Sequence, residues 1–323
     1  MSTADCLPSS EQDASPDMDP VLIGVDWGTS SFRAYLMNRE GAVLEKVESA
    51  DGVSAVPPGA FPAAYRRLVG PWLAARPGIA AIASGMVGSR NGWREAPYAR
   101  CPANPATIAD ALVAVDADGA RVWLAPGLAC EDESGAPDVM RGEEVEILGI
   151  ADAGARLVVL PGSHSKWAEV EGGRVLRFRT FVTGELFAAV KDHTLLGAFA
   201  RAAPPQEPGP AFALGVETGA AAARGEKGAG FIGALFSART LPLMGKLAEK
   251  DAREYLSGLM IGAEIAEASR LFSQAAPSVA GAPALVRRYL AAFAALDLRS
   301  EAAPAGAAAR GLFLLSWSAG LFA

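Results

Sequence analysis

Alternating hydrophobic and polar positions near the start of the chain predict a strand, a polar loop and a hairpin. Residues 21–25 form a short run rich in β-branched side chains, which is typical of a buried strand. Residues 28–31 then combine a glycine with three hydroxyl side chains, and alternation resumes at 32–37 before a turn at 38–41. A glycine–hydroxyl loop between two strands offers donors to an anion, although an ordinary hairpin with a polar turn explains this segment equally well.

The same pattern occurs a second time in the middle of the chain. An apolar run at residues 157–160 leads into a glycine–hydroxyl loop at 161–165, and a hairpin follows at 166–181. Two such loops facing each other would hold a polyphosphate from both sides; a chance match of short patterns is the competing explanation. Aligning the copies places Leu160 at the position of Asp26, so only the first copy keeps a carboxylate, as expected if it serves one magnesium–phosphate group.

Between the two copies the pattern indicates mixed strands and helices. Strands are expected at residues 78–83 and 122–125. Residues 137–151 are expected to form a loop that enters a helix, with Glu143 and Glu144 in its first turn, where the helix dipole favours negative charge.

After the second copy the chain becomes mainly helical. Helices are expected to open at Thr183 and to run over residues 252–272 and 284–296. Gly258 and Gly262 lie four positions apart in the long helix, so one face there carries no side chains. This spacing predicts close packing against another helix.

Composition narrows the class of protein. Hydrophobic residues make up 51% and charged residues 20% of the 323 residues, which is typical of a globular chain with one large or two ordinary domains. The net charge of −7 excludes a broad electrostatic surface for nucleic acid, and a small anionic substrate would need a local basic pocket. Three cysteines without CxxC spacing and two histidines argue against a disulfide framework and a metal centre of these residues, and they fit a reducing cytoplasm.

Neither end of the chain predicts a membrane segment. Residues 1–20 are acidic and rich in Ser and Pro and lack the apolar stretch of a signal peptide, so they are expected to form a disordered tail. The apolar C-terminal stretch LFLLSWSAGLFA is far shorter than a membrane span and is expected to be a buried last helix.

Six stretches, in order, resemble the diagnostic motifs of the 2-dehydro-3-deoxygalactonokinase family, within the sugar kinase, Hsp70 and actin superfamily. They are VDWGTSSFRAYL, GMVGSRNGWREAPY, PDVMRGEE, LPGSHSKW, FVTGEL and LSGLMIGAE. The resemblance covers nearly everything from Val21 onward. It implies an α/β fold of two ribonuclease-H-like (actin-like ATPase) lobes, over residues 21–150 and 151–323, with a nucleotide cleft between them.

The family resemblance implies a cytoplasmic enzyme that uses ATP and Mg²⁺ to phosphorylate the 6-hydroxyl of 2-dehydro-3-deoxy-D-galactonate. Its product would belong to galactonate breakdown, where an aldolase would cleave it. A kinase for another keto-deoxy sugar acid, or a non-catalytic sugar-sensing ATPase of the same fold, is the alternative. The expected partner is a small-molecule sugar acid, and no nucleic acid or membrane is expected. A homo-oligomer is compatible with the sequence.

The resemblance also implies where nucleotide and metal bind. Asp26 would orient magnesium and its waters, and Gly281 matches the turn at which the superfamily approaches the adenosine. Ser163 stands where threonine is usual, and residues 280–282 lack the small hydroxyl residue expected there. The residues expected to contact ATP or magnesium are Asp26, Gly28, Thr29, Ser30, Gly162, Ser163, His164 and Gly281.

A sugar-acid substrate additionally needs a clamp for its carboxylate. Arginine suits this role because its planar guanidinium pairs with a carboxylate through two hydrogen bonds. Arg141 is the preferred clamp because it lies beside the candidate base, although a solvated charge or ordinary packing is the simpler explanation for any single candidate. The residues expected near the substrate are Arg33, Gly85, Met86, Arg90, Trp93, Tyr98, Arg141 and Lys166.

The resemblance to sugar kinases implies that the base for the attacking hydroxyl is a carboxylate shortly before the second loop, at the start of a helix. Helical spacing separates Glu143 and Glu144 by about 100°, so at most one of them should face the cleft. Glu143 is preferred because it directly follows Gly142, and Asp138 is the alternative. Asp138 could instead stabilise its own loop.

Overall fold

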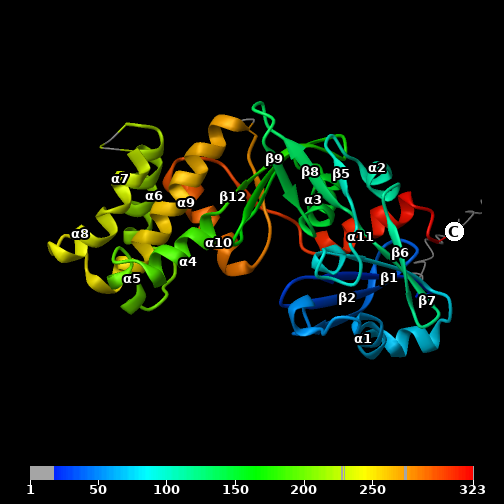
Figure 1. The fold of residues 1–323 in the computed structure, drawn as a ribbon. Coiled ribbons are helices and arrows are strands. Elements are labelled where there is room, and N and C mark those ends of the chain that lie inside the picture. The colour runs from blue at the N-terminus through cyan, green and yellow to red at the C-terminus, as the bar shows by residue number, and fades with distance from the viewer. Residues whose placement is uncertain (1–17, 227, 229, 273–274, 323) are drawn as a thin grey trace, which may run out of the picture.

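The computed structural model describes residues 18–322 except residues 227, 229 and 273–274. Most of the tail expected at residues 1–20 therefore lies outside the described residues. The described chain forms a sheet-based lobe at each end of a central, three-stranded sheet, and helices α4 to α9 extend the second lobe (Figure 1). No described helix is both long and apolar enough to span a lipid bilayer.

The first lobe is built on a six-stranded sheet with the order β3-β2-β1-β4-β7-β6. Its first three strands form an antiparallel meander, and β1, β4 and β7 run parallel. Alternate residues of β1 enter different cores: Ile23 and Val25 pack with helix α1 (Phe61–Ala75), and Leu22 packs with helix α11 (Ala307–Ser318). The strands are β1 (Pro20–Trp27), β2 (Phe32–Asn38), β3 (Val43–Ser49), β4 (Ala80–Ser84), β6 (Val113–Ala117) and β7 (Ala120–Leu124).

The second lobe repeats this topology in a five-stranded sheet with the order β12-β11-β10-β13-β14. Again an antiparallel meander comes first, and two further strands lie parallel to its first strand. The repeated strand–loop–hairpin unit and the two ribonuclease-H-like lobes are therefore confirmed. The strands are β10 (Leu157–Leu160), β11 (Ser165–Glu171), β12 (Arg174–Phe181), β13 (Ser278–Val279) and β14 (Glu301–Ala302).

Glycines allow two helices of the second lobe to pack backbone against backbone. A Cβ on Gly258 or Gly262 of α9 would lie 2.1 Å from a carbonyl oxygen of α6, and Gly215 and Gly219 of α6 are equally close to α9. The close packing predicted from Gly258 and Gly262 is confirmed. The helices of this lobe are α4 (Thr183–His193), α5 (Ala198–Ala202), α6 (Pro210–Ala223), α7 (Gly230–Leu235), α8 (Ser237–Leu243), α9 (Ala252–Leu271) and α10 (Pro283–Ala295).

The last helix returns to the first lobe. A Cβ on Gly149 of α3 (Glu143–Asp152) would lie 2.0 Å from the Ala307 carbonyl oxygen, so α3 and α11 are in backbone contact. Leu312 and Leu315 of α11 are fully buried, which confirms the predicted buried last helix. Figure 1 shows α11, in red, lying beside β1 although the two are at opposite ends of the chain.

A three-stranded sheet connects the lobes. Strand β5 (Tyr98–Arg100) pairs with β8 (Gly127–Glu131), and β8 pairs with β9 (Pro137–Met140). The expectation of a loop at residues 137–140 was wrong, because they form strand β9 along β8, whereas the predicted helix with Glu143 and Glu144 in its first turn is confirmed. A short helix, α2 (Pro105–Ala109), lies between β5 and β6.

Candidate active site

The first glycine–hydroxyl loop is held in place by the segment that follows β3. The Gly28 N–H donates to the Ser31 carbonyl at 2.9 Å, and the Val53 N–H donates to the Gly28 carbonyl at 2.9 Å. A Cβ on Gly52 would lie 2.3 Å from the Thr29 carbonyl oxygen, so the approach requires glycine. The loop is fixed through its backbone carbonyls, whereas Thr29 and Ser30 are exposed.

The second loop is held in the same way by the start of α4. The Glu185 N–H donates to the Ser163 carbonyl at 3.0 Å, and a Cβ on Gly184 would lie 2.3 Å from the Gly162 carbonyl oxygen. Within the loop, His164 Nε2 lies 2.8 Å from a Glu185 carboxylate oxygen, and Ser163 Oγ lies 3.1 Å from His164 Nδ1. The two copies therefore share a loop, a third strand and a glycine that follows this strand and supports the loop.

The fourth strand of each sheet ends beside the loop, again at a glycine. Gly85 follows β4 with φ +92°, and a Cβ there would lie 2.7 Å from the Trp27 carbonyl oxygen. Gly281 follows β13 with φ +123°, and its Cβ would lie 3.5 Å from the Pro161 carbonyl oxygen. Positive φ is a conformation that glycine adopts without steric cost. Both glycines thus sit at equivalent points, directly beside the two loops.

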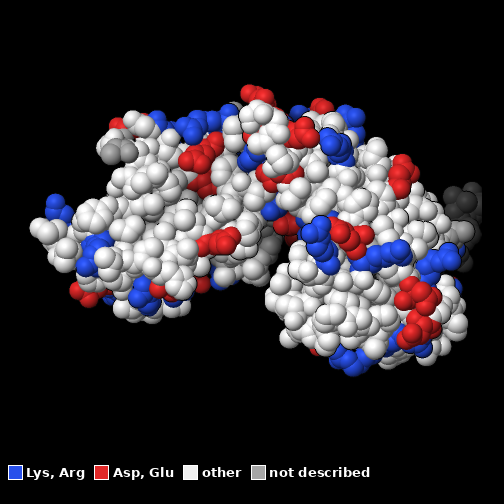
Figure 2. Space-filling view, viewed as in Figure 1, with Lys and Arg blue, Asp and Glu red and all other residues white. Residues whose placement is uncertain are grey.

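A continuous series of contacts joins the two loops across the molecule. Gly142, which precedes α3, approaches Gly85 so closely that a Cβ on Gly142 would lie 3.0 Å from the Gly85 Cα. Lys166 Nζ of β11 lies 3.5 Å from Glu143 Oε1, and Lys166 Nζ also donates to the His164 carbonyl at 3.4 Å. The surface is hollowed between the lobes, and both acidic and basic residues line this hollow (Figure 2). This hollow is the cleft between the two lobes, and each lobe carries one of the loops.

Carboxylates gather at the first-lobe side of this cleft. Asp26, at the end of β1, accepts a hydrogen bond from Arg33 at 3.0 Å. Burial raises the pKa of Asp26 above its ordinary value, and the charge of Arg33 opposes this shift. Burial, followed by the charges of Asp26 and Glu143, raises the pKa of Glu146 to about 7. No three His, Cys, Asp or Glu side chains within the described ranges are arranged to hold a metal ion directly.

Glu146 was missed in the sequence analysis although a signal was available. It lies three residues after Glu143 on α3, and residues three apart share one face of a helix. The spacing of the acidic residues on the helix therefore predicts that Glu146 lies on the same face as Glu143.

Glu143 and Glu144 have opposite surroundings. The Glu143 side chain is 32% exposed beside Lys166, whereas Glu144 is fully buried. One Glu144 oxygen accepts a hydrogen bond from the Gly142 N–H at 2.6 Å, and the other has no hydrogen-bond partner among the described residues. Burial, followed by the Glu143 charge, raises the pKa of Glu144 to about 8. Only Glu143 of this pair is placed to contact a ligand in the cleft.

Asp138 lies on β9 and joins the central sheet to the second lobe. Both of its carboxylate oxygens accept hydrogen bonds from Thr180 of β12, one from the N–H and one from the hydroxyl, each at 2.6 Å. Its side chain is only 10% exposed. These contacts account for Asp138 as a structural link between strands.

The guanidinium of Arg141 lies among residues 85–98 and is only partly hydrogen-bonded within the described part of the chain. Its Nη2 donates to the Ala96 carbonyl at 2.8 Å, and its guanidinium lies 4.4 Å from the centre of the Tyr98 ring. The Nε and Nη1 atoms are buried and have no hydrogen-bond partner within the described part of the chain. Gly88 lies against the same guanidinium, with 3.1 Å from its hypothetical Cβ to Nη1. The stretch GMVGSRNGWREAPY therefore forms the surroundings of Arg141.

The other predicted substrate residues have varied surroundings. Trp93 packs on the rings of Trp27, Phe61 and Tyr65 in the first-lobe core. The side chain of Arg90 is 86% exposed and lies 3.8 Å from a Glu95 oxygen. Met86, in a short 3₁₀ turn (Met86–Gly88), packs partly buried against the first-lobe core.

A cavity of about 220 Å³ adjoins the second loop. Gly162 and three residues of α4 (Thr183, Gly184 and Phe187) line one part of it, and residues of α9 and α10 line the rest. This volume is below the roughly 300–1,000 Å³ typical of small-molecule sites, so the cavity suits one part of a ligand that continues into the cleft.

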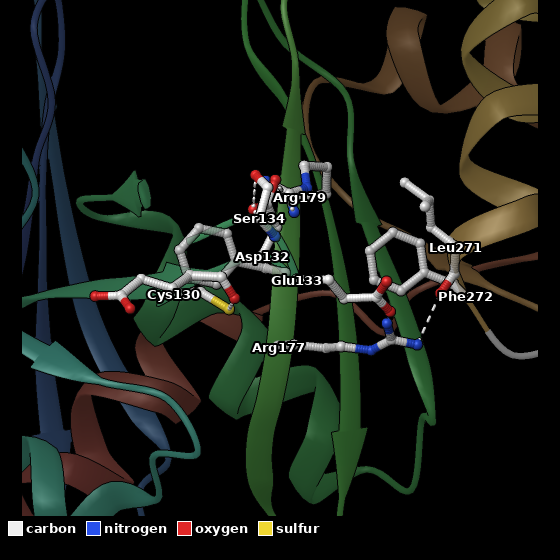
Figure 3. Close-up of a pocket in the computed structure, with 10 residues that line it drawn as sticks. Cys130, Asp132, Glu133, Ser134, Arg177, Arg179, Leu271 and Phe272 are labelled. Atoms are coloured by element: carbon white, nitrogen blue, oxygen red, sulfur yellow. Dashed lines mark hydrogen bonds and ion pairs between the residues drawn. The ribbon is translucent and has the colours of Figure 1, made fainter. Parts of the chain in front are cut away.

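A larger cavity, of about 360 Å³, lies elsewhere, between the β8–β9 turn, β12 and the end of α9 (Figure 3). Its cations are already paired: Arg177 donates to the Leu271 carbonyl at 2.7 Å, and Arg179 lies 3.2 Å from Asp132. None of the residues predicted to bind nucleotide or substrate lines it. It is therefore separate from the candidate active site.

Comparison with known families decides the assignment. A sequence profile described as 2-keto-3-deoxy-galactonokinase matches residues 26–315. The chain belongs to this family. The match begins at Asp26 and includes both glycine–hydroxyl loops and α3, so the cleft described above lies within the part of the chain that is similar to the 2-keto-3-deoxy-galactonokinase family.

Individual members of the family are similar over most of their length. The chain is 41% identical over 253 residues to the probable 2-dehydro-3-deoxygalactonokinase DgoK1 of Rhizobium meliloti (strain 1021), covering 76% of this chain and 79% of the relative. It is 34% identical over 277 residues to the 2-dehydro-3-deoxygalactonokinase of Escherichia coli (strain K12), covering 85% and 89%. A crystal structure of a candidate 2-dehydro-3-deoxygalactonokinase from Sinorhizobium meliloti superposes with a TM-score of 0.74 at 35% identity, covering 92% of this chain and 95% of that one.

Proposed function

We propose that this chain transfers the γ-phosphoryl group of ATP to the 6-hydroxyl of 2-dehydro-3-deoxy-D-galactonate, in the breakdown of galactonate in the cytoplasm. The observation that carries the proposal is the Glu143–Lys166 contact at 3.5 Å, because it brings a carboxylate beside the first loop to a cation beside the second. Membership of the 2-keto-3-deoxy-galactonokinase family supports the choice of substrate.

The two loops hold the phosphates of ATP. Backbone N–H groups and the hydroxyls of Thr29, Ser30 and Ser163 supply donors, as in other anion-binding loops. The base of the nucleotide enters the 220 Å³ cavity, which begins at Gly162 and continues toward the helix after Gly281. This arrangement places the terminal phosphate toward the first lobe, where Asp26 and Glu146 lie.

The carboxylates fit a magnesium ion. Mg²⁺ usually keeps several waters and binds through one or two carboxylates together with substrate phosphates. Asp26 and Glu146 supply the oxygen atoms that it prefers, and the charge of Asp26 already contributes to the raised pKa of Glu146, so a cation would relieve this repulsion. Bound there, Mg²⁺ would neutralise negative charge on the transferring phosphoryl group.

Arg141 binds the carboxylate of the sugar acid. Its guanidinium is fixed by the Ala96 carbonyl and the Tyr98 ring, which leaves Nε and Nη1 to donate to a substrate. A guanidinium and a carboxylate form two parallel hydrogen bonds, and these orient the acid as well as bind it. The distal hydroxyl of the acid is thereby directed toward the loops.

Glu143 accepts the proton of the attacking hydroxyl. As the 6-oxygen bonds to the γ-phosphorus, its proton passes to a Glu143 oxygen, the bond between the γ-phosphorus and the bridging oxygen breaks, and ADP leaves. Such a transfer needs alignment and positive charge more than covalent chemistry. Lys166 supplies a cation close to both Glu143 and the second loop.

A coupled assay tests the proposal. The purified protein, supplied with ATP and Mg²⁺, should release ADP when 2-dehydro-3-deoxygalactonate is added and should release much less with other keto-deoxy sugar acids. Equal ATP consumption without a sugar acid, or no phosphorylation of any acid in the panel, would contradict a kinase. A clear preference for a different keto-deoxy acid would contradict the proposed substrate but would still support a sugar-acid kinase.

A further inference from the structure

The 220 Å³ cavity runs along one face of α9 and has two ends. Arg253, Ser257, Met260 and Ile261 line it, at the spacing of a single helix face. The end near the second loop is lined by Gly162, Thr183 and Tyr289.

Arg253 lies at the other end. Ile261, the last residue of α9 that lines the cavity, lies eight positions after Arg253, which corresponds to about 12 Å along the helix axis. A ligand that places its phosphates at Gly162 and its base in the cavity therefore presents the base, and not the phosphates, to Arg253.

The charge of Arg253 is available to a ligand. Arg288, the other cation of the cavity, is held by both oxygens of Glu254, at 2.7 and 3.0 Å, and by the Gln206 carbonyl at 2.8 Å. Arg253 is half-buried and lines the cavity, and no hydrogen bond or ion pair joins it to another residue in the described part of the chain. Of these two cations, only Arg253 has free donors and a free guanidinium face.

We propose that Arg253 determines affinity for the base of the bound nucleotide, with its guanidinium lying against the face or edge of the ring. A guanidinium is planar and weakly hydrated, and it stacks on aromatic rings. The apolar side chains of Met260, Ile261 and Leu285 line the same cavity and cover the rest of the base. This inference rests on the proposed function, since it requires that the ligand be ATP.

Binding of adenosine, AMP and ADP to the full-length protein, measured by calorimetry, tests the inference. Arg253→Met keeps most of the aliphatic part of the side chain and removes the charged, planar guanidinium. Arg253→Lys keeps the positive charge without the planar group. Arg287→Met is the matched control, because Arg287 lies one residue before Arg288 on the exposed side of α10, is paired with Glu207, and does not line the cavity. Unchanged melting temperatures are expected because Arg253 has no partner to lose in the described structure.

Arg253→Met should weaken the binding of all three ligands by the same factor, about five- to thirtyfold, the range between an exposed and a desolvated cation–π contact. Arg253→Lys should be intermediate and Arg287→Met within about twofold of wild type. The KM for ATP should rise while the KM for the sugar acid and kcat stay nearly unchanged. A loss that grows with the number of phosphates would overturn the inference in favour of a phosphate contact, and no loss would overturn it outright. If the wild-type protein binds no ADP, the proposed function itself fails.

Discussion

At the scale of single residues, burial distinguishes two neighbouring glutamates. Glu143 faces Lys166 in the cleft, whereas Glu144 is fully buried and has a pKa raised to about 8. Helical spacing could predict that only one of them would reach the cleft. Helical spacing could not predict the raised pKa of Glu146, because this pKa depends partly on Asp26, which is 120 positions away in the sequence.

Glu143→Gln is expected to lower kcat by roughly 10²–10⁴-fold, because the amide cannot accept the proton of the attacking hydroxyl. Both KM values should change little. Steady-state kinetics measures this, with Asp138→Asn as the comparison. Asp138→Asn should mainly lower the melting temperature, since it weakens the contacts to Thr180. The reverse pattern would assign the base to Asp138.

Arg141→Lys is expected to raise the KM for the sugar acid roughly 10–100-fold, because an ammonium group cannot form the bidentate hydrogen bonds of a guanidinium to a carboxylate. The KM for ATP should stay within about twofold. Arg90→Lys provides the control, because the Arg90 side chain is 86% exposed and its nearest partner carboxylate among the described residues, Glu95, is 3.8 Å away. An unchanged KM for the sugar acid in Arg141→Lys would indicate that Arg33 or Lys166, and not Arg141, binds the substrate carboxylate.

Glu144→Gln should change how stability depends on pH. The pKa of Glu144 is about 8 in the folded protein and near 4.5 when unfolded, so the folded state binds more protons between these values. Glu144 therefore makes the free energy of unfolding fall as pH rises from about 4.5 to about 8. Glutamine does not titrate and its oxygen can still accept from the Gly142 N–H.

The stability of Glu144→Gln relative to wild type should thus increase from pH 5 to pH 8, by on the order of a few kcal/mol. Urea unfolding at both pH values measures the difference. The neighbouring Glu146 titrates in both proteins and cancels in the comparison. A difference that does not depend on pH would show that Glu144 is not a buried, protonated carboxyl.

At the scale of elements, the sequence predicted local units well and their contacts poorly. Alternation and the glycine–hydroxyl loops identified both meanders, and the spacing of Gly258 and Gly262 identified a packing face. The supporting glycines, Gly52 and Gly184, were not recognised, because their partners lie more than twenty positions earlier in the chain. Strand β9 was missed because four residues beginning with proline carry no alternation signal.

Gly184→Ala tests whether these supporting glycines position the phosphate loops. The added Cβ would lie 2.3 Å from the Gly162 carbonyl oxygen, so the second loop must shift. A displacement of about 1 Å can cost roughly 10²-fold in rate, and kcat/KM for ATP should fall by that order. Gly70→Ala in α1 is the matched control, since no atom lies within 4 Å of its hypothetical Cβ. Unchanged kinetics with a folded Gly184→Ala protein would mean that loop position is not critical.

At the scale of the whole molecule, the chain crosses between its lobes more than once. The last helix, α11, packs on α3 and against β1, so residues near both ends of the chain complete the first lobe. The sequence predicted that this helix would be buried, because Leu312 and Leu315 lie on an apolar stretch. It could not say against which sheet, since an apolar face does not specify its partner. The motifs, by contrast, were sufficient to predict two similar lobes and a cleft.

The account as a whole is tested most directly by identifying the product. The full-length protein should be incubated with ATP, Mg²⁺ and 2-dehydro-3-deoxygalactonate, and the product examined by phosphorus–proton correlation NMR. The account predicts one new phosphate ester, coupled to the two protons on carbon 6, in an amount equal to the ADP formed. A phosphate on any other carbon, or ADP formed with inorganic phosphate and no ester, would contradict it.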